Sequence, residues 1–319
     1  MENRDINDRI RESAGTFIAE CDHDYRQQLH DAAGAIARQL GARGPVILLS
    51  GPSGSSKTTT AKFIGEYLTH FGVRCHIISL DDYYFNGDSG RYPVDEDGNQ
   101  DLESPLGLDL GLLNRHMTAL AQGKEVKIPY FDFRSRKRDR GGARPLSLGE
   151  NEAVIFEGIN ALNPLIADRQ PKAIRVFVAP TTPLTRKGKV LFDCEKIRLL
   201  RRTVRDLNHR NESALGTLTV WASVMRGERK YITPYAPTAD ITIDSTLGYE
   251  VPVLGYIVKP MYEQYIVNYI NDADFAIMRG GKNKMAIDCI SAYLTTKVLA
   301  ERFEHEAKAA AAPEPGEEA

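Results

Sequence analysis

Apolar and polar positions alternate along the chain in two patterns. Stretches with the three-and-four spacing of amphipathic helices separate five short apolar runs of the kind that form buried strands. These runs are "VILLS" from Val46, "CHIISL" from Cys75, "AVIFEG" from Ala153, "IRVFVA" from Ile174 and "ITID" from Ile241. Strands that alternate with helices predict an α/β fold, with a doubly wound, mainly parallel five-stranded sheet and flanking helices.

The two ends of the chain lie outside this alternation. Apolar residues recur at helical spacing from Tyr25 to Leu40, which predicts an N-terminal helical extension over residues 1–43 in front of a core over residues 44–250. We expect C-terminal helices over residues 251–306 and a disordered tail over residues 307–319, which has little apolar surface to bury. Neither end has an assignable chemistry, and contact between two copies in a homo-oligomer is the only role we expect.

Composition excludes several classes of protein. A formal charge of -2 gives no bulk electrostatic reason to expect nucleic acid or a membrane as the main partner. The four cysteines form no C-x-x-C pair, which is typical of thiols in a reducing compartment. The N-terminus lacks the order of a signal peptide, and no apolar run approaches the ~18 residues of a membrane span. We therefore expect a cytoplasmic protein.

The first apolar run leads into "GPSGSSKT", which is one residue short of the phosphate-binding P-loop pattern G-x-x-x-x-G-K-[ST]. In such a loop, backbone N–H groups and the positive end of the following helix surround a phosphate. Lys57 would reach the β- and γ-phosphates, and the Thr58 hydroxyl would lie on Mg²⁺. The residues expected to bind the nucleotide are Gly51, Pro52, Ser53, Gly54, Ser55, Ser56, Lys57, Thr58 and Thr59.

Ser56 stands where the pattern has glycine. If that position needs a positive φ, serine costs roughly 1–2 kcal/mol of backbone strain. Gly54, two positions earlier, could let the loop adopt a different backbone path that compensates for this strain. The alternative interpretation is a strand followed by a serine-rich helix cap without a ligand.

Acidic residues follow two of the predicted strands. Asp81 and Asp82 come after "IISL", and Glu157 comes after "AVIF". Ligands of open α/β sheets collect at the carboxyl ends of the strands. A kinase needs one carboxylate for Mg²⁺ and one to accept the proton of the attacking hydroxyl, although a single acid in this position also serves as a helix cap.

A predicted helix, "EKIRLLRRTVRDLNHR", places Arg198, Arg202 and Arg205 opposite its apolar side. Such a face is either solvated or part of a lid that covers a transferring phosphoryl group, which we place around residues 195–215, with Arg210 just beyond the triplet. A second basic run, "FRSRKRDRGGAR" from Phe133, predicts a solvated hairpin.

Five segments match, in order, motifs of one kinase family. They are "SLDDYY" from Ser79, "DLESPLGLDLGLL" from Asp101, "IPYFDF" from Ile128, "VIFEGI" from Val154 and "RLLRRTVRD" from Arg198. Together with the P-loop, they resemble the uridine kinase-like branch of the phosphoribulokinase and uridine kinase family of P-loop kinases. The resemblance runs from about Val46 to Leu247.

The resemblance implies a role for each matched residue. Asp81 would be the general base and, with Thr58 and Glu157, would hold the metal ion. The residues implied at the substrate are Asp82, Tyr84, Glu103 at the ribose hydroxyls, Phe131 and Phe133 at the base, Arg202 and Arg205. Arg205 and Arg210, with Lys57, would neutralise the transferring phosphoryl group.

The implied activity is transfer of the γ-phosphate of ATP or GTP, with Mg²⁺, to the 5'-hydroxyl of uridine or cytidine in pyrimidine salvage. The base pocket departs from the family pattern, because Leu102 replaces an aromatic residue and Phe131 lacks a tyrosine hydroxyl. No histidine lies between Phe131 and Arg144. A different small alcohol (a sugar phosphate, pantothenate or glycerate) and a nucleotide-binding switch without kinase activity therefore remain alternatives.

Overall fold

The computed structural model describes residues 1–96, 98–210 and 212–271. The expected helices beyond residue 271 and the expected disordered tail lie outside these residues. The chain divides into two compact units. Unit 1 comprises Met1–Asp24, Pro180–Val220 and the chain from Thr246, and unit 2 comprises Tyr25–Ala179 and Trp221–Ser245.

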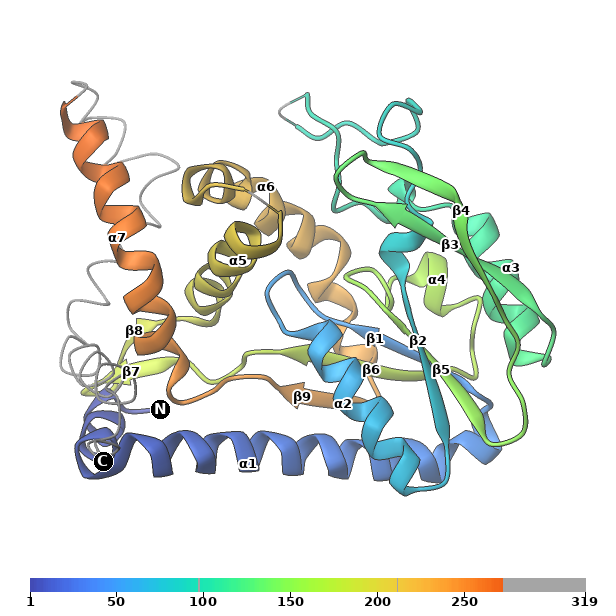
Figure 1. Ribbon diagram of the computed structural model, residues 1–319, viewed down its shortest axis with the longest axis horizontal. Coiled ribbons are helices and arrows are strands. Elements are labelled where there is room, and N and C mark those ends of the chain that lie inside the picture. Colours follow the sequence, from blue (N-terminus) through green and yellow to red (C-terminus); the bar gives the residue numbers. More distant parts are fainter. Residues whose placement is uncertain (97, 211, 272–319) are drawn as a thin grey trace, which may run out of the picture. The chain divides into compact units, whose positions relative to one another are not determined.

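A five-stranded parallel sheet forms the centre of unit 2, in the order β2-β5-β1-β6-β9 (Figure 1). Its strands are β1 (Val46–Ser50), β2 (Arg74–Ser79), β5 (Glu152–Glu157), β6 (Ile174–Ala179) and β9 (Ile241–Asp244). All five coincide with the apolar runs of the sequence, so the predicted doubly wound α/β fold is confirmed. β1 lies between β5 and β6, and the chain order of the strands reverses there.

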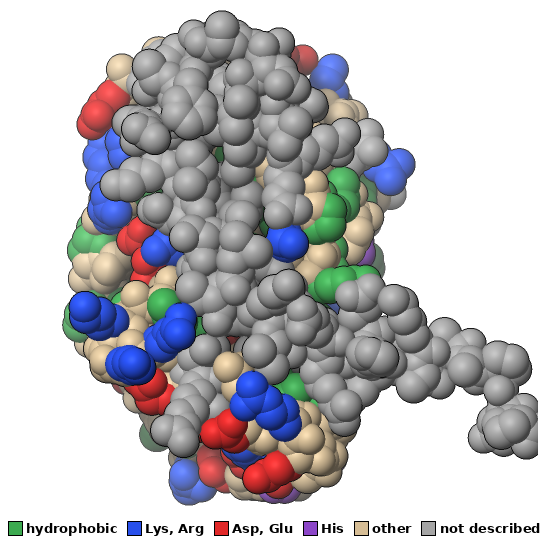
Figure 2. All heavy atoms as spheres, turned by 90° about the vertical axis from the view of Figure 1, so that its left-hand side faces the viewer, with side chains coloured by type: hydrophobic (Ala, Val, Ile, Leu, Met, Phe, Trp, Pro, Cys, Tyr) green, Lys and Arg blue, Asp and Glu red, His purple; other side chains and the backbone are tan. Residues whose placement is uncertain are grey.

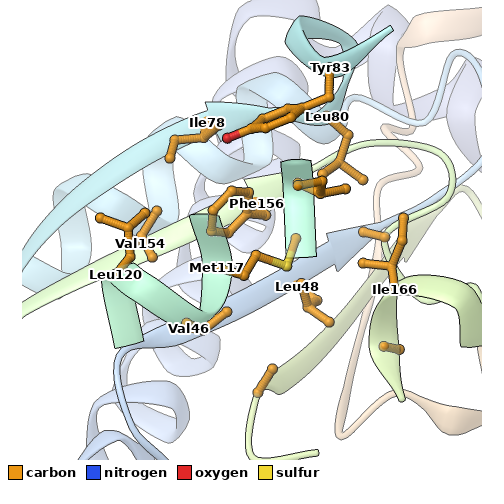
Figure 3. Close-up of a cluster of buried hydrophobic side chains, with 14 of the residues drawn as sticks. Val46, Leu48, Ile78, Leu80, Tyr83, Met117, Leu120, Val154, Phe156 and Ile166 are labelled. Carbon is orange, nitrogen blue, oxygen red and sulfur yellow. The ribbon is translucent and has the colours of Figure 1, made fainter. Parts of the chain in front are cut away.

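Alternate residues of the central strand enter different cores, because successive side chains of a strand point to opposite faces. Val46 and Leu48 pack with Phe156 and Tyr83 on one face, in the buried cluster that Figure 3 shows together with Met117. The helices of this layer are η1 (Leu80–Tyr83), α3 (Leu110–Ala121) and α4 (Pro164–Ala167), and η2 (Pro105–Gly107) lies between η1 and α3 in the chain.

The other face of the sheet is covered by the helix that precedes β1 in the chain and the helix that follows it. Ile47 and Leu49 pack there with Leu29 and Ile36 of α1 (Asn3–Arg43) and with Ile64 of α2 (Lys57–His70). All five side chains are fully buried. The predicted N-terminal helical extension is confirmed, and its second half is part of the core of unit 2.

The basic run forms part of an antiparallel hairpin, as predicted, between β3 (Val126–Asp132) and β4 (Lys137–Leu146). A further helix, α6 (Ala214–Tyr231), and the 3-10 helix η3 (Thr233–Thr238) precede β9.

Unit 1 joins the beginning of the chain to the segments that follow β6 and β9. Its elements are the first part of α1, the hairpin β7 (Leu184–Arg186) with β8 (Lys189–Phe192), α5 (Cys194–Arg210), the start of α6, and α7 (Glu250–Asn271). Extended backbone at Ser13 interrupts α1. Arg201 of α5 forms a bidentate ion pair with Glu250 of α7, at 2.6 and 2.9 Å. The Thr203 and Tyr262 hydroxyls of these helices lie 2.7 Å apart.

The charges on the surface and the polarity of the helices are consistent with the net charge and the hydrophobicity of the sequence. On the face shown in Figure 2, Lys and Arg side chains are interspersed with Asp and Glu, as expected for a chain of net charge -2. Within residues 1–96, 98–210 and 212–271, no helix has the length and apolar character that crossing a membrane requires.

Candidate nucleotide and acceptor site

The P-loop lies between the carboxyl end of β1 and the first turn of α2. Gly51 needs its small size, because a Cβ there would collide with the Val178 carbonyl oxygen of β6 and lie 2.7 Å from Ser55 Oγ. Lys57, the first residue of α2, donates from Nζ to the Pro52 carbonyl oxygen at 3.0 Å. The lysine therefore folds back over the loop whose N–H groups would surround a phosphate.

Ser56 has the left-handed backbone conformation that the P-loop pattern predicts for its missing glycine. Its φ is 68° and its ψ is 23°, and its side chain forms no capping hydrogen bond with α2. Gly54 also has a positive φ, 77°. The loop therefore keeps a left-handed residue at the P-loop position and carries serine there.

Thr58, in the first turn of α2, contacts Glu157, the last residue of β5. Thr58 Oγ1 donates to Glu157 Oε1 at 3.0 Å, and Glu157 is only 6% exposed. Burial raises the pKa of Glu157, the positive charge of Lys57 lowers it, and the negative charge of Asp81 raises it further. These electrostatic effects place Lys57, Asp81 and Glu157 in one cluster with Thr58.

Asp81 reaches this cluster from the end of β2. The strand stops at Ser79, whose Oγ accepts a hydrogen bond from the Asp81 backbone N–H at 3.3 Å and starts the short helix η1. Because β2 pairs with β5 in register up to Ser79 and Glu157, the acids that follow both strands lie at the same edge of the sheet.

The donor set suits a magnesium-nucleotide complex better than a metal ion held by protein alone. Residues 1–96, 98–210 and 212–271 contain no group of three His, Cys, Asp or Glu side chains that could hold a metal ion. Mg²⁺ bound with phosphates needs only one or two protein oxygens and keeps several waters. The Thr58 hydroxyl and the Glu157 carboxylate, with Asp81 close by, fit that requirement.

Asp82 points to the β3–β4 hairpin. Its Oδ1 accepts the Phe131 backbone N–H at 3.2 Å. Burial raises the pKa of Asp82, while the Phe131 hydrogen bond and the Arg144 charge lower it. This contact ties the hairpin to the turn that carries Asp81, so Asp82 has a structural role beside the substrate role that the family pattern implies.

Arg138 of β4 holds the same turn from the other side. It donates from Nε to the Tyr84 carbonyl oxygen at 2.8 Å and from Nη2 to the Tyr83 carbonyl oxygen at 2.5 Å, and it pairs with Asp109 at 3.2 Å. The sequence offered no means of separating this arginine from its basic neighbours.

Aromatic side chains gather beside the turn that carries Asp81. The ring centroids of Tyr84 and Phe131 are 5.9 Å apart, and those of Phe131 and Phe133 are 5.3 Å apart in an edge-to-face arrangement. Phe131 is 5% exposed and Phe133 is 48% exposed. Tyr84 Oη donates to the Leu102 carbonyl oxygen at 3.0 Å, which links the aromatic group to the segment that carries Glu103.

Glu103 is held through its backbone. Its N–H donates to Asp101 Oδ1 at 3.1 Å, and its carbonyl oxygen accepts from Asn160 Nδ2 at 3.0 Å. Asn160, which is 1% exposed, follows β5 by three residues. The sequence analysis did not single out Asp101 or Asn160.

The arginines of the predicted lid helix belong to unit 1, where three of them surround one carboxylate. Arg202 Nε and Arg205 Nε donate to Asp206 at 3.1 and 3.0 Å, and Arg210 Nε lies 3.7 Å from it. Asp206 is 2% exposed. The buried Asp206 carboxylate therefore brings three guanidinium groups of α5 together.

The predicted division of α5 into two faces is wrong at two positions. Arg198, expected on the arginine face, is 3% exposed, whereas Leu207, expected on the apolar side, is 40% exposed. α5 packs against α7, and its buried side extends over Arg198 and Thr203.

Known proteins include chains that are similar to this one. The chain is 25% identical over 257 residues to a uridine kinase of Geobacillus sp. (strain WCH70), covering 81% of this chain and 96% of that protein. It is 27% identical over 259 residues to a uridine kinase of Bacillus mycoides (strain KBAB4), with the same coverage.

Solved structures of kinases also resemble the chain. A putative fructose transport system kinase from Silicibacter sp. TM1040 has a TM-score of 0.46 at 18% identity, covering 67% of this chain and 98% of that one. A possible uridine kinase from Bacillus stearothermophilus has a TM-score of 0.43 at 17% identity, covering 68% and 99%. The model of the phosphoribulokinase / uridine kinase family matches residues 46–252. This match covers more than half of the chain, which therefore belongs to the phosphoribulokinase / uridine kinase family.

Proposed function

We propose that this protein is a nucleoside kinase that transfers the γ-phosphate of ATP or GTP to the 5'-hydroxyl of uridine or cytidine. The observation that carries the proposal is the cluster of Lys57, Thr58, Glu157 and Asp81 at the carboxyl ends of β1, β5 and β2. A phosphate-binding loop, a metal-binding pair and a candidate general base are the parts that phosphoryl transfer to an alcohol requires.

Each residue of the cluster has a role in the proposed reaction. Asp81 accepts the proton of the attacking hydroxyl, and Lys57 with the loop N–H groups neutralises the β- and γ-phosphates. Thr58 and Glu157 would hold Mg²⁺, which when bound offsets the negative charge on the phosphates. Arg205 and Arg210 of the lid helix neutralise charge on the transferring group.

The acceptor side supports a nucleoside. We assign Glu103 to the ribose hydroxyls and Tyr84, Phe131 and Phe133 to the base, which an aromatic group can stack against. The uridine kinases among the relatives support this assignment. We place Arg202 at the substrate as well. Pyrimidine salvage and a cytoplasmic location follow as parts of the same proposal.

The alternative acceptor is a different small alcohol, with a sugar phosphate as the member that the basic run would favour. Two of the arginines in that run already have protein partners. Arg138 holds the catalytic turn, and Arg136 donates to Gln100 Oε1 at 2.7 Å. These contacts favour a structural role for the run and support the nucleoside.

An acceptor panel tests the proposal. Release of ADP or GDP is measured with uridine, cytidine, glycerate, pantothenate and a pentose phosphate, each with ATP and GTP. We expect turnover with uridine or cytidine, and turnover with another alcohol alone would contradict the nucleoside assignment. Nucleotide binding without acceptor-dependent turnover would indicate the non-catalytic switch.

The first prediction concerns the general base. Asp81→Asn keeps the size of the side chain and removes its ability to accept the proton, so kcat with the preferred acceptor should fall by roughly 10²–10⁴. Steady-state kinetics measure this loss. Asp88→Asn, an exposed aspartate outside the cluster, is the control, and near-normal turnover of Asp81→Asn would exclude Asp81 as the base.

A further inference from the structure

A glycine near the C-terminal end of α6 lies directly against Glu103. Glycine in a helix interior lowers stability relative to alanine, so close packing against a neighbouring side chain is the expected reason for Gly227. A Cβ at Gly227 would collide with Glu103 Cβ and lie 2.7 Å from Glu103 Cγ. Because Gly227 has no side chain, the Glu103 side chain can occupy the space next to α6.

The same helix also contacts Asp101, whose side chain binds the backbone at Glu103. Tyr231 Oη donates to Asp101 Oδ2 at 2.9 Å, while Asp101 Oδ1 accepts the N–H groups of Glu103 and Ser104, both at 3.1 Å. Asp101 thus transmits the position of Tyr231 to the backbone of Glu103. The Glu103 carbonyl oxygen is fixed independently by Asn160 Nδ2.

A second contact fixes the preceding turn to α6. Ser223 Oγ donates to Asp95 Oδ2 at 3.1 Å, and the Arg226 guanidinium lies 3.9 Å from the same oxygen. Contacts about two turns apart on α6 therefore hold Asp95 and Asp101. All of these residues belong to unit 2.

We propose that α6 positions the acceptor-binding carboxylate Glu103, through the close contact at Gly227 and the Tyr231–Asp101 hydrogen bond. The proposal rests on the proposed function, in which Glu103 binds the acceptor hydroxyls. Gly227, Tyr231 and Asp101 are positioning residues, because they act on the acceptor through Glu103.

The test combines kinetics with structure in the full chain. Gly227→Ala should raise the acceptor KM by about tenfold or more and leave the nucleotide KM within about twofold, because only the acceptor carboxylate is displaced. Tyr231→Phe should raise the acceptor KM by a smaller factor, about threefold. The matched controls are Gly41→Ala, where a Cβ meets nothing within 4 Å, and Tyr256→Phe, an exposed tyrosine of α7. Both controls should leave the acceptor KM unchanged.

A double-mutant cycle separates positioning from general damage to the fold. In a Glu103→Ala background, adding Gly227→Ala should give no further rise in the acceptor KM, because the carboxylate is already gone. Additive KM effects would overturn the inference. An acceptor KM that stays normal in both Gly227→Ala and Tyr231→Phe would overturn it as well.

A crystal structure of Gly227→Ala makes the inference testable independently of the acceptor's identity. The Cβ that this substitution adds and the Glu103 Cβ must separate to the ~3.5–4.0 Å of ordinary carbon–carbon contact. We therefore expect Glu103 to move by about 1 Å. An unmoved Glu103 would overturn the positioning role even if the kinase assignment holds. A moved Glu103 in a protein that phosphorylates no nucleoside would support the positioning role and overturn the proposed function. If Gly227→Ala does not fold, the Tyr231→Phe kinetics and structure decide the question.

Discussion

Ser56 holds a left-handed backbone conformation at a position where the P-loop pattern has glycine. The positive φ of this residue was predictable, because the pattern fixes which position of the loop turns. Its energetic cost was predictable as well, since a side chain Cβ crowds the carbonyl oxygen in this region. The partners of Gly227 and Arg138 were not predictable, because they come from segments far away in the chain.

The second prediction is that Ser56→Gly stabilises the protein slightly. Glycine relieves roughly 1–2 kcal/mol of strain but adds about 0.5–1 kcal/mol of conformational entropy to the unfolded chain. The net gain in free energy of unfolding should be about 1 kcal/mol or less, measured by urea denaturation, with nucleotide affinity equal or higher. Gly54→Ala, at the other left-handed position, is the reverse control and should destabilise. A large loss of affinity in Ser56→Gly would mean that the serine hydroxyl contacts the phosphates.

Single contacts also join whole elements, as the end of α1 and the start of β9 illustrate. Arg43 Nη1 lies 2.8 Å from Asp240 Oδ2, which also accepts the Arg175 backbone N–H of β6 at 2.8 Å. Burial raises the pKa of Asp240, but the hydrogen bonds from Arg43 and Arg175 outweigh it and hold this pKa below the ordinary value of 3.8.

The third prediction follows from the sign of this shift. A carboxylate whose pKa is lowered by folding stabilises the protein above its unfolded pKa, and that contribution is lost as the pH falls through the folded pKa. Asp240→Asn should therefore lower the free energy of unfolding at pH 7 by about 1 kcal/mol or less, since the pair is partly exposed. The difference from the wild type should fade below about pH 4.

Chemical denaturation between pH 3 and pH 8 measures the effect. Asp31→Asn, an exposed carboxylate on α1, is the control and should leave the pH profile unchanged. A difference between Asp240→Asn and wild type that stays constant over the whole range would show that charge is not the cause.

At the scale of the whole molecule, segments distant in the chain share each compact unit. The second half of α1 lies in the core of unit 2, and α5 packs with α7 in unit 1. The predicted linear boundaries at residues 43 and 250 stay predictions, because the compact units are discontinuous in sequence. Lys57, Thr58, Asp81 and Glu157 all lie within unit 2.

The fourth prediction concerns the stability of the whole chain. A ligand that binds only the folded state stabilises it by mass action, by about 2.7 kcal/mol at one hundred times its Kd. Mg²⁺ with ATP should therefore raise the Tm of the wild type, measured by differential scanning calorimetry. Lys57→Ala should abolish most of this rise, whereas the exposed Lys62→Ala should preserve it. An equal rise in Lys57→Ala would contradict the assignment of the phosphate site.

The sequence by itself determined the five strands, the P-loop and the acids at the carboxyl ends of β2 and β5. Local patterns suffice for these features, because a strand of a parallel sheet is one apolar run and a phosphate loop is one continuous segment. Only the tertiary structure decided that Arg198 is buried, that Asp82 holds the hairpin, and that a helix more than a hundred residues further along the chain presses a glycine against Glu103. Each of these depends on which distant element packs where, and composition and periodicity carry no information about partners brought together by folding.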